Sequence, residues 1–188
     1  MPNGRHIGVN PPPAAHPENS PAETVEEVAP DGTVLRLVSR REMRESVLRH
    51  RSVFIAVVSH DGDLLVHRRA DTKDVWPGCW DVCVGGVVSP GESWDAAAVR
   101  ELGEELGVEG AVIAHLGSGA YEDADVRLVG HVYECRCDGP FRFADGEITE
   151  AHWVSPAEFP NWLGAKTFLP DSLALVLPRL GGFRHLAP

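Results

Sequence analysis

The sequence predicts a mixed α/β protein in which a sheet of mixed strand directions is covered by helices on its two faces. Three observations predict this class. Several segments have the β-branched or alternating character of strands, one long amphipathic helical segment interrupts them at residues 93–107, and short helical segments follow near the end. Because such helices must bury their apolar stripes against the strands, we expect two helical layers around one sheet.

Length and composition indicate one compact domain with a separate tail. The chain has 188 residues, of which 43% are hydrophobic, and this is enough for one sizeable core. Seven of the fifteen prolines lie in residues 1–30, and no aromatic residue precedes Phe54. We therefore expect residues 1–23 to be a flexible proline-rich tail and residues 24–188 to be the folded domain.

Turn and cap residues mark the first elements of this domain. A Pro-Asp-Gly turn at residues 30–32 separates two short extended pieces. Ser39 and Glu42 form an S-x-x-E capping box, which predicts a short helix over residues 40–49. A His-Asp-Gly turn at residues 60–62 then lies between two β-rich runs and predicts a hairpin.

The second half of the chain returns to strands and ends in helices. Residues 111–137 predict two strands around an acidic turn, and residues 147–155 predict a further strand. Ser155 and Glu158 form a second capping box, which predicts a short helix. Another short helix is expected over residues 171–177.

Composition also limits the partners and the compartment. No stretch approaches the run of about 20 apolar residues that spans a bilayer, and the N-terminus lacks the apolar core of a secretory signal. We therefore expect a cytoplasmic protein without a membrane partner. A formal net charge of −11 opposes contact with long nucleic acids, but it does not oppose a small phosphorylated substrate bound through a metal ion.

The four cysteines are expected to be reduced. Cys79 and Cys83 are spaced C-x3-C and Cys135 and Cys137 are spaced C-x-C, and neither spacing is that of a zinc knuckle. Cys135 and Cys137 alternate with polar residues, as on one face of a strand. We interpret this second pair as small core residues.

The long helical segment is marked at both of its ends. Ser93 is placed to cap its N-terminus, and Gly107 is placed to end it in the left-handed conformation. Small residues in its apolar stripe allow close approach to a sheet. The expected stripe consists of Ala97, Leu102, Leu106 and either Ala98 or Val99.

The opposite face of this helix is acidic. Glu101 lies three residues before Glu104 and four before Glu105, so the three carboxylates lie within about one turn. Arg100 can neutralise only Glu104, four residues further on. A hard divalent cation would neutralise the remainder, because Mg²⁺ prefers oxygen ligands and also binds phosphates. By themselves, three glutamates more often form a solvated helix face.

Spacing distinguishes these two alternatives. Residues 86–108 match the pattern G-x5-E-x7-R-E-U-x-E-E-x-G-U at every fixed position, where U is an aliphatic residue. A chance match of this kind in one chain has a probability below about one in a million. The segment resembles the Nudix box.

This resemblance implies a Nudix fold, which is an α/β/α sandwich around a mixed sheet, with the box as a loop–helix–loop that binds Mg²⁺ or Mn²⁺. It also implies hydrolysis of a nucleoside diphosphate linked to another group, with water as the nucleophile, and it is compatible with a homodimer. The metal ligands carried over by position are Glu101, Glu104 and Glu105, assisted by the carbonyl of Gly85 or Gly86, with Arg100 and Glu92 orienting the carboxylates.

Resemblance extends from about residue 24 to residue 178, and it is similar in detail to the subgroup near isopentenyl-diphosphate isomerase. Arg68, Arg69 and Lys73 could bind substrate phosphate, or they could be a solubilising hairpin edge. Trp76 and Trp80 flank a Pro-Gly turn, where they could stack on a base or a prenyl group; Trp80 could equally belong to the core.

Two further residues are candidates for the site. Only His50 of the nine histidines stands where the isomerases have a metal-binding histidine, and a structural role is its alternative. Glu147 precedes the last predicted strand, where related enzymes place another acidic residue. Glu147 or a box glutamate would accept the proton of the attacking water, so the candidate catalytic residues are Glu104, Glu105, Arg100 and Glu147.

Two alternatives to hydrolysis remain open: a prenyl diphosphate isomerase and a non-catalytic nucleotide-binding sensor. In the isomerase pattern, Gly85 stands at the position of the catalytic cysteine and Val87 at that of a metal-binding histidine, while Cys83 lies two residues earlier. The complete box argues against a sensor. We therefore predict a Mg²⁺- or Mn²⁺-dependent pyrophosphohydrolase, and the sequence leaves its diphosphate substrate and oligomeric state open.

Overall fold

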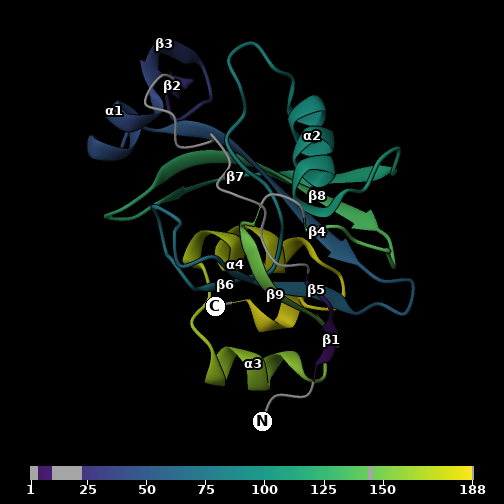
Figure 1. Ribbon diagram of the computed structural model, residues 1–188. Coiled ribbons are helices and arrows are strands. Elements are labelled where there is room, and N and C mark those ends of the chain that lie inside the picture. The colour runs from purple at the N-terminus through teal and green to yellow at the C-terminus, as the bar shows by residue number, and fades with distance from the viewer. Residues whose placement is uncertain (1–3, 10–22, 144–145, 188) are drawn as a thin grey trace.

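A computed structural model describes residues 4–9, 23–143 and 146–187 (Figure 1). The strands in this part of the chain are β1 (Arg5–Ile7), β2 (Thr24–Val28), β3 (Val34–Ser39), β4 (His50–Val58), β5 (Leu64–Arg69), β6 (Trp80–Asp81), β7 (Ile113–Glu122), β8 (Arg127–Arg136) and β9 (Ile148–Val154). The α-helices are α1 (Arg40–Glu45), α2 (Trp94–Leu106), α3 (Phe159–Ala165) and α4 (Pro170–Val176), and two 3₁₀ turns follow at Leu177–Arg179 and Arg184–Leu186.

The main sheet is mixed, as predicted. Its strand order is β1-β9-β5-β4-β8-β7, and β6 pairs with β5. The central strands β4 and β8 are parallel, whereas the other pairs are antiparallel. Strands β2 and β3 form a separate two-stranded sheet beside α1. The predicted turn at residues 30–32 joins these two strands, and Gly32 has a φ of 84° there.

Strand β4 is buried on both faces, which explains why it reads as a continuous apolar run. One hydrophobic cluster joins one face of the strand to α2, and another joins the opposite face to α3 and α4. The α/β/α sandwich is therefore confirmed. The α2 side of β4 presents Val53, Ile55 and Val57, and the opposite side presents Phe54, Ala56 and Val58.

The ends of α2 confirm the predicted caps. The N–H of Ala96 donates to Ser93 Oγ at 3.2 Å, and Gly107 ends the helix with a φ of 65°. Of the two candidates for the apolar stripe, Ala98 is buried and Val99 is 45% exposed. The helix consequently presents its small residues to the sheet and its glutamates to the loop before it.

The prediction of a flexible tail over residues 1–23 is wrong for residues 5–7. Arg5–Ile7 form β1, which pairs antiparallel with β9. A strand of three residues adds to a sheet edge through backbone hydrogen bonds, so its side chains need carry no apolar pattern. Residues 10–22 lie outside the described residues, and the domain boundary near residue 24 stays a prediction.

The helix expected over residues 40–49 is shorter than predicted. Ser39 Oγ accepts the N–H of Glu42 at 3.1 Å, which confirms the cap, but α1 ends at Glu45. Val47 has a positive φ of 48°, so the chain turns away and enters β4 at residue 50.

The later elements lie close to their predicted positions. The second capping box forms between Ser155 and Glu158, but it closes a turn, and α3 begins only at Phe159. Cys135 is fully buried and Cys137 packs partly buried against the same cluster, and all four cysteines are free. None of the helices in the described ranges is long and apolar enough to cross a membrane.

Candidate active site

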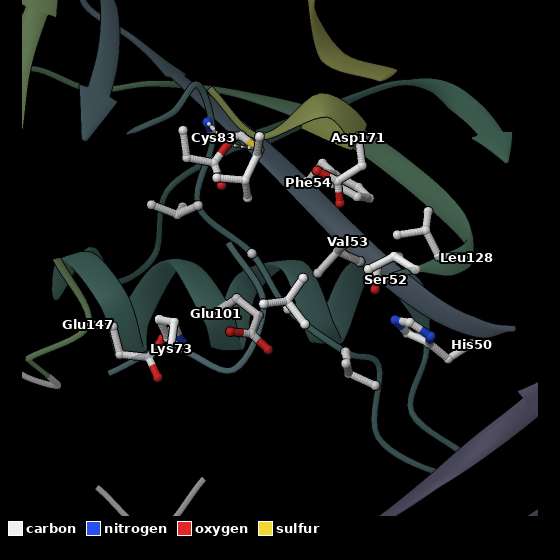
Figure 2. A pocket seen from close by; sticks show the side chains of 18 of the residues that line it. His50, Ser52, Val53, Phe54, Lys73, Cys83, Glu101, Leu128, Glu147 and Asp171 are labelled. Atoms are coloured by element: carbon white, nitrogen blue, oxygen red, sulfur yellow. Dashed lines mark hydrogen bonds and ion pairs between the residues drawn. The ribbon is translucent and has the colours of Figure 1, made fainter. Parts of the chain in front are cut away.

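A cavity lies where α2, the loop before it, β4 and the segment after β5 meet. Figure 2 shows Glu101 and Glu147 toward one end of this cavity and Cys83 and Asp171 toward the other, with Val53 of β4 between them. The cavity therefore joins the acidic helix to groups that come from distant parts of the chain.

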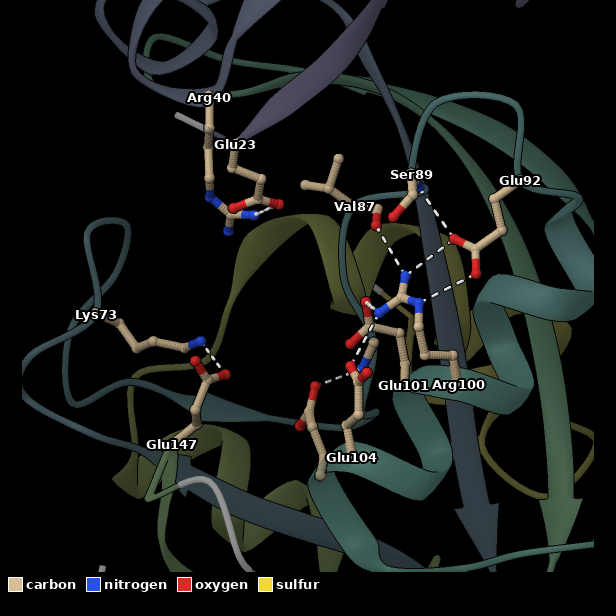
Figure 3. A network of polar contacts seen from close by, with 12 residues as sticks. Glu23, Arg40, Lys73, Val87, Ser89, Glu92, Arg100, Glu101, Glu104 and Glu147 are labelled. Carbon is tan, nitrogen blue, oxygen red and sulfur yellow. Dashed lines mark hydrogen bonds and ion pairs between the residues drawn. The ribbon is translucent and has the colours of Figure 1, made fainter. Parts of the chain in front are cut away.

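Arg100 organises the carboxylates on the side of the cavity formed by α2. Its Nε and Nη2 donate to Glu92, both at 3.1 Å, and Nη1 donates to Glu101 at 2.8 Å and to Glu104 at 2.9 Å (Figure 3). Nη2 also donates to the carbonyl of Val87. Burial disfavours the charged guanidinium, but the bonds to Glu92 and Glu101 outweigh it and raise the pKa of Arg100 above its usual value. One cation thus holds three carboxylates in place.

Glu101 and Glu105 also lie against the glycine loop. Glu101 and Glu105 are each only 7% exposed, and Glu105 accepts the N–H of Gly85 at 3.1 Å. A Cβ on Gly86 would lie 2.5 Å from Glu101 Oε1, so only glycine allows this approach. The carbonyl of Gly86 accepts the N–H of Val53 at 3.0 Å, which leaves it one lone pair for a ligand.

The donor chemistry of this region suits a hard divalent cation. Carboxylates and a backbone carbonyl are oxygen donors of the kind that Mg²⁺ and Mn²⁺ bind. Within the described ranges, no three acidic, histidine or cysteine side chains are already gathered as a metal site, because Glu101 and Glu104 point to Arg100. A cation would be held by turning these carboxylates from the guanidinium.

Cations lie across the cavity from α2. Lys73 forms an ion pair with Glu147, which lies in the loop before β9 as expected (Figure 3). Arg69 lines the cavity and donates to the carbonyl of Val75 at 3.2 Å, and Trp76 lines the same wall. The structure brings these four side chains together around one cavity.

Not every predicted substrate residue reaches the cavity. Arg68 contacts Asp71 at 2.6 Å and Thr149 at 3.4 Å, and it is absent from the described lining. Its neighbour Arg69 does line the cavity, because successive residues of a strand point to opposite faces. Trp80 is 4% exposed and packs edge-on against Trp162, which makes it a core residue.

His50 has the features of a structural histidine. It is 2% exposed, and its Nδ1 lies 3.1 Å from the carbonyl of Leu48. Burial, reinforced by the charge of Arg44, lowers the pKa of His50 to about 4. The ring is therefore neutral at physiological pH.

Sequence reasoning missed the acidic end of the cavity. Asp81 and Asp171 are each 6% exposed, and Cys83 donates through its thiol to Asp81 at 3.5 Å. Burial, followed by the charge of Asp81, raises the pKa of Asp171 to about 7. No sequence signal distinguished Asp171, because an acidic residue in the first turn of a helix is ordinary.

Arg40 and Arg44 of α1 were missed as well, and both line the cavity. Their spacing within a short capped helix resembles that of surface arginines. Only the packing of α1 against the mouth of the cavity distinguishes them.

Fold and site together define a class: an α/β/α protein whose loop–helix–loop presents carboxylates to a cavity with cations on its opposite side. A family model described as the NUDIX domain matches residues 48–172. The chain is 38% identical over 151 residues to the Nudix hydrolase YfcD of Escherichia coli (strain K12), covering 80% of this chain and 83% of that protein. It is 36% identical over 159 residues to the Nudix hydrolase PA4841 of Pseudomonas aeruginosa, covering 85% and 94%.

A solved structure agrees with these sequence relatives. The crystal structure of DR0079 from Deinococcus radiodurans superposes with a TM-score of 0.69 at 25% identity, covering 88% of this chain and 97% of that one. The chain therefore belongs to the Nudix family, and it is an enzyme of the Nudix pyrophosphohydrolase type. The predictions of family, fold and enzyme class are confirmed.

Proposed function

We propose that this protein hydrolyses a diphosphate linkage in a nucleoside diphosphate derivative or related organic diphosphate, with Mg²⁺ or Mn²⁺ as its cofactor. The observation that carries the proposal is the position of the three box glutamates: Arg100 binds Glu101 and Glu104, and Glu101 and Glu105 lie against the glycine loop. This grouping faces Lys73 across the cavity.

The three glutamates and the Gly86 carbonyl would hold the divalent cation. When bound, such a cation supplies positive charge for phosphate oxygens and lowers the pKa of a coordinated water. Arg100, itself bonded to Glu92, keeps Glu101 and Glu104 on the α2 side of the cavity, and these two carboxylates would turn from the guanidinium to the cation when it binds.

Lys73 and Arg69 would bind the substrate phosphates from the opposite wall. A phosphate that pairs with Lys73 competes with Glu147 for this ammonium group. Glu147 would then be released as a proton acceptor when substrate is present. Glu104, which is the exposed member of the box, is the alternative acceptor for the proton of the attacking water.

Geometry at residue 85 favours hydrolysis over prenyl isomerisation. Gly85 has a φ of 150°, and a Cβ there would lie 2.0 Å from the carbonyl oxygen of Val53. The catalytic cysteine of the isomerases therefore has no room at this position without a backbone shift. Cys83 is buried, and burial raises the pKa of its thiol well above the usual value, so that it stays protonated.

A substrate screen tests the proposal. Nucleoside diphosphate sugars, dinucleotides, nucleoside triphosphates and prenyl diphosphates are incubated with Mg²⁺ or Mn²⁺, and released phosphate is measured after phosphatase treatment. We expect turnover of at least one class, lost in EDTA. Turnover that persists in EDTA contradicts the metal dependence, and formation of dimethylallyl diphosphate from its isomer contradicts the reaction type.

The remaining expectations are tested with the same preparation. Binding of a nucleotide without turnover of any class would favour a sensor. We propose a homodimer, which light scattering coupled to size exclusion distinguishes from a monomer. We also propose a cytoplasmic location without membrane or long nucleic acid partners, which cell fractionation tests.

A further inference from the structure

Three arginines form one wall of the cavity. Arg40 and Arg44 lie one helical turn apart on α1, Arg69 comes from β5, and all three line the cavity. We call them the arginine wall. Burial and, after it, the positive charge of Arg40 lower the pKa of Arg44 to about 10.

The charges and hydrogen-bond donors of the arginine wall have too few partners among the described residues. Arg40 pairs with Glu23 at 3.1 Å, and Arg69 donates to a backbone carbonyl. No carboxylate of the described residues lies within salt-bridge distance of Arg44, although Asp74 and Asp171 act on it at longer range. Across the described ranges, the buried Nε groups of Arg40, Arg44 and Arg69 have no hydrogen-bond partner. Such unsatisfied donors beside a cavity are unfavourable unless a ligand accepts from them.

This wall is separate from the glutamates of α2. In Figure 3, Arg40 and Glu23 lie across an open space from Arg100, Glu101 and Glu104. An anion on the arginine wall would therefore be held by different groups from those that hold a cation on α2.

A comparison within α1 shows that the wall is more than a charged helix surface. Arg41 lies between Arg40 and Arg44 in sequence, but its side chain is 70% exposed and pairs with Glu45 at 3.1 Å. Arg41 thus shows the arrangement of an ordinary surface arginine. Arg44 instead lines the cavity, where solvent does not satisfy its Nε.

We propose that Arg40, Arg44 and Arg69 form an anion subsite that binds a phosphoryl group of the substrate beyond the linkage that is cleaved. Guanidinium groups suit this ligand, because their planar forks donate in pairs to phosphate oxygens and keep their charge when partly desolvated. The inference rests on the proposed function for the identity of the ligand as substrate. It defines the substrate class as organic diphosphates that carry an additional anionic group.

Binding of inorganic pyrophosphate in EDTA tests the subsite without any turnover. Metal-free glutamates repel this anion, so calorimetric binding reports on the cationic side chains of the cavity, and substitution of Arg44 isolates the share of the arginine wall. We expect Arg44→Gln to weaken pyrophosphate binding about 10-fold to 100-fold, which is the range for a charged hydrogen bond. Arg41→Gln is the matched control on the same helix, and it should leave the dissociation constant within about 2-fold.

A second variant covers the case in which Arg44→Gln does not fold, which thermal melting would show. Glu23→Gln removes the carboxylate that competes for Arg40, so it should tighten pyrophosphate binding several-fold. Absence of binding by the wild-type protein in EDTA would overturn the proposal, as would equal weakening in Arg41→Gln and Arg44→Gln. Either result leaves metal-dependent hydrolysis intact, whereas failure of hydrolysis leaves the metal-free binding measurement unaffected.

Discussion

The two walls of the cavity satisfy their charges in opposite ways. One wall is formed by α2 and the glycine loop before it, and we call it the α2 wall. There Arg100 bonds to three carboxylates, and the glycine loop donates to a fourth. On the arginine wall, the buried Nε groups of Arg40, Arg44 and Arg69 lack acceptors within the described ranges. The first wall is organised before any ligand binds, whereas the second retains donors for a ligand. One cavity thus combines carboxylates that are already paired with a guanidinium, which a cation would have to replace, with donors that still lack an acceptor.

Replacing a glutamate of the α2 wall should have the largest effect. Glu105→Gln removes a charge but keeps the size, so we expect kcat to fall about 10²-fold to 10³-fold at saturating Mg²⁺. Stability should stay equal or rise, because like-charge repulsion is relieved. Steady-state kinetics and thermal melting measure both quantities.

The exposed Glu109→Gln serves as the control for Glu105→Gln. Metal-free pyrophosphate binding should be unchanged in Glu109→Gln and should not weaken in Glu105→Gln, because the arginine wall and not the glutamates binds the anion. Wild-type kcat in Glu105→Gln would exclude Glu105 as a metal ligand.

Asp171, which lines the same cavity, should make stability depend on pH. Its pKa is raised to about 7 in the folded protein, compared with 3.8 for the free side chain. The folded state therefore binds the extra proton, and the contribution of Asp171 to stability is full below pH 3.8 and is lost as pH rises through about 7. The loss amounts to a few kcal/mol.

Asp171→Asn removes this titration. The unfolding free energy of the variant minus that of the wild type should increase from pH 5 to pH 8. Chemical denaturation at both pH values measures this difference. The same difference in unfolding free energy at both pH values would show that Asp171 does not titrate in this range.

A methyl group at residue 85 should disturb the α2 wall through the backbone. Gly85→Ala would place a Cβ 2.0 Å from the carbonyl oxygen of Val53 at a φ of 150°. We expect a loss of about 2 kcal/mol or more in unfolding free energy. Gly110→Ala is the control, since its φ is 67° but no atom lies within 4 Å, and it should lose only about 1 kcal/mol. Equal losses would mean that the loop accommodates a side chain by moving.

Replacing Arg100 should have the smallest of these effects. Arg100 is 30% exposed, so Arg100→Gln should lower the unfolding free energy by about 1 kcal/mol in EDTA. Mg²⁺ should restore much of this loss, because it neutralises the same carboxylates. Arg127→Gln removes a surface pair with Glu122 and should change little. A loss that Mg²⁺ does not reduce would argue against a metal among these glutamates.

The α2 wall could be predicted from local sequence patterns. Ser93, Gly107 and the three box glutamates lie within one helix and its caps, where a period of 3.6 residues fixes which side chains share a face. The buried strand β4 was also recognisable, because its apolar run does not depend on its partners. The helix at residues 40–49 was predicted too long, because no local sequence feature predicted the positive φ of Val47.

The opposite wall depends on how distant elements pack against one another. Arg44, Arg69 and Asp171 are separated by many residues, and they meet because the strand order places β5 next to β4 while α1 and α4 pack near the same opening. The pairing of β1 with β9 likewise joins residues 5–7 to residues 151–153 through backbone bonds that leave no side-chain pattern. Local periodicity records contacts within an element, whereas charges gathered from separate elements depend on topology. This is why the α2 wall could be predicted as a group, whereas only Arg69 of the arginine wall was a candidate from the sequence.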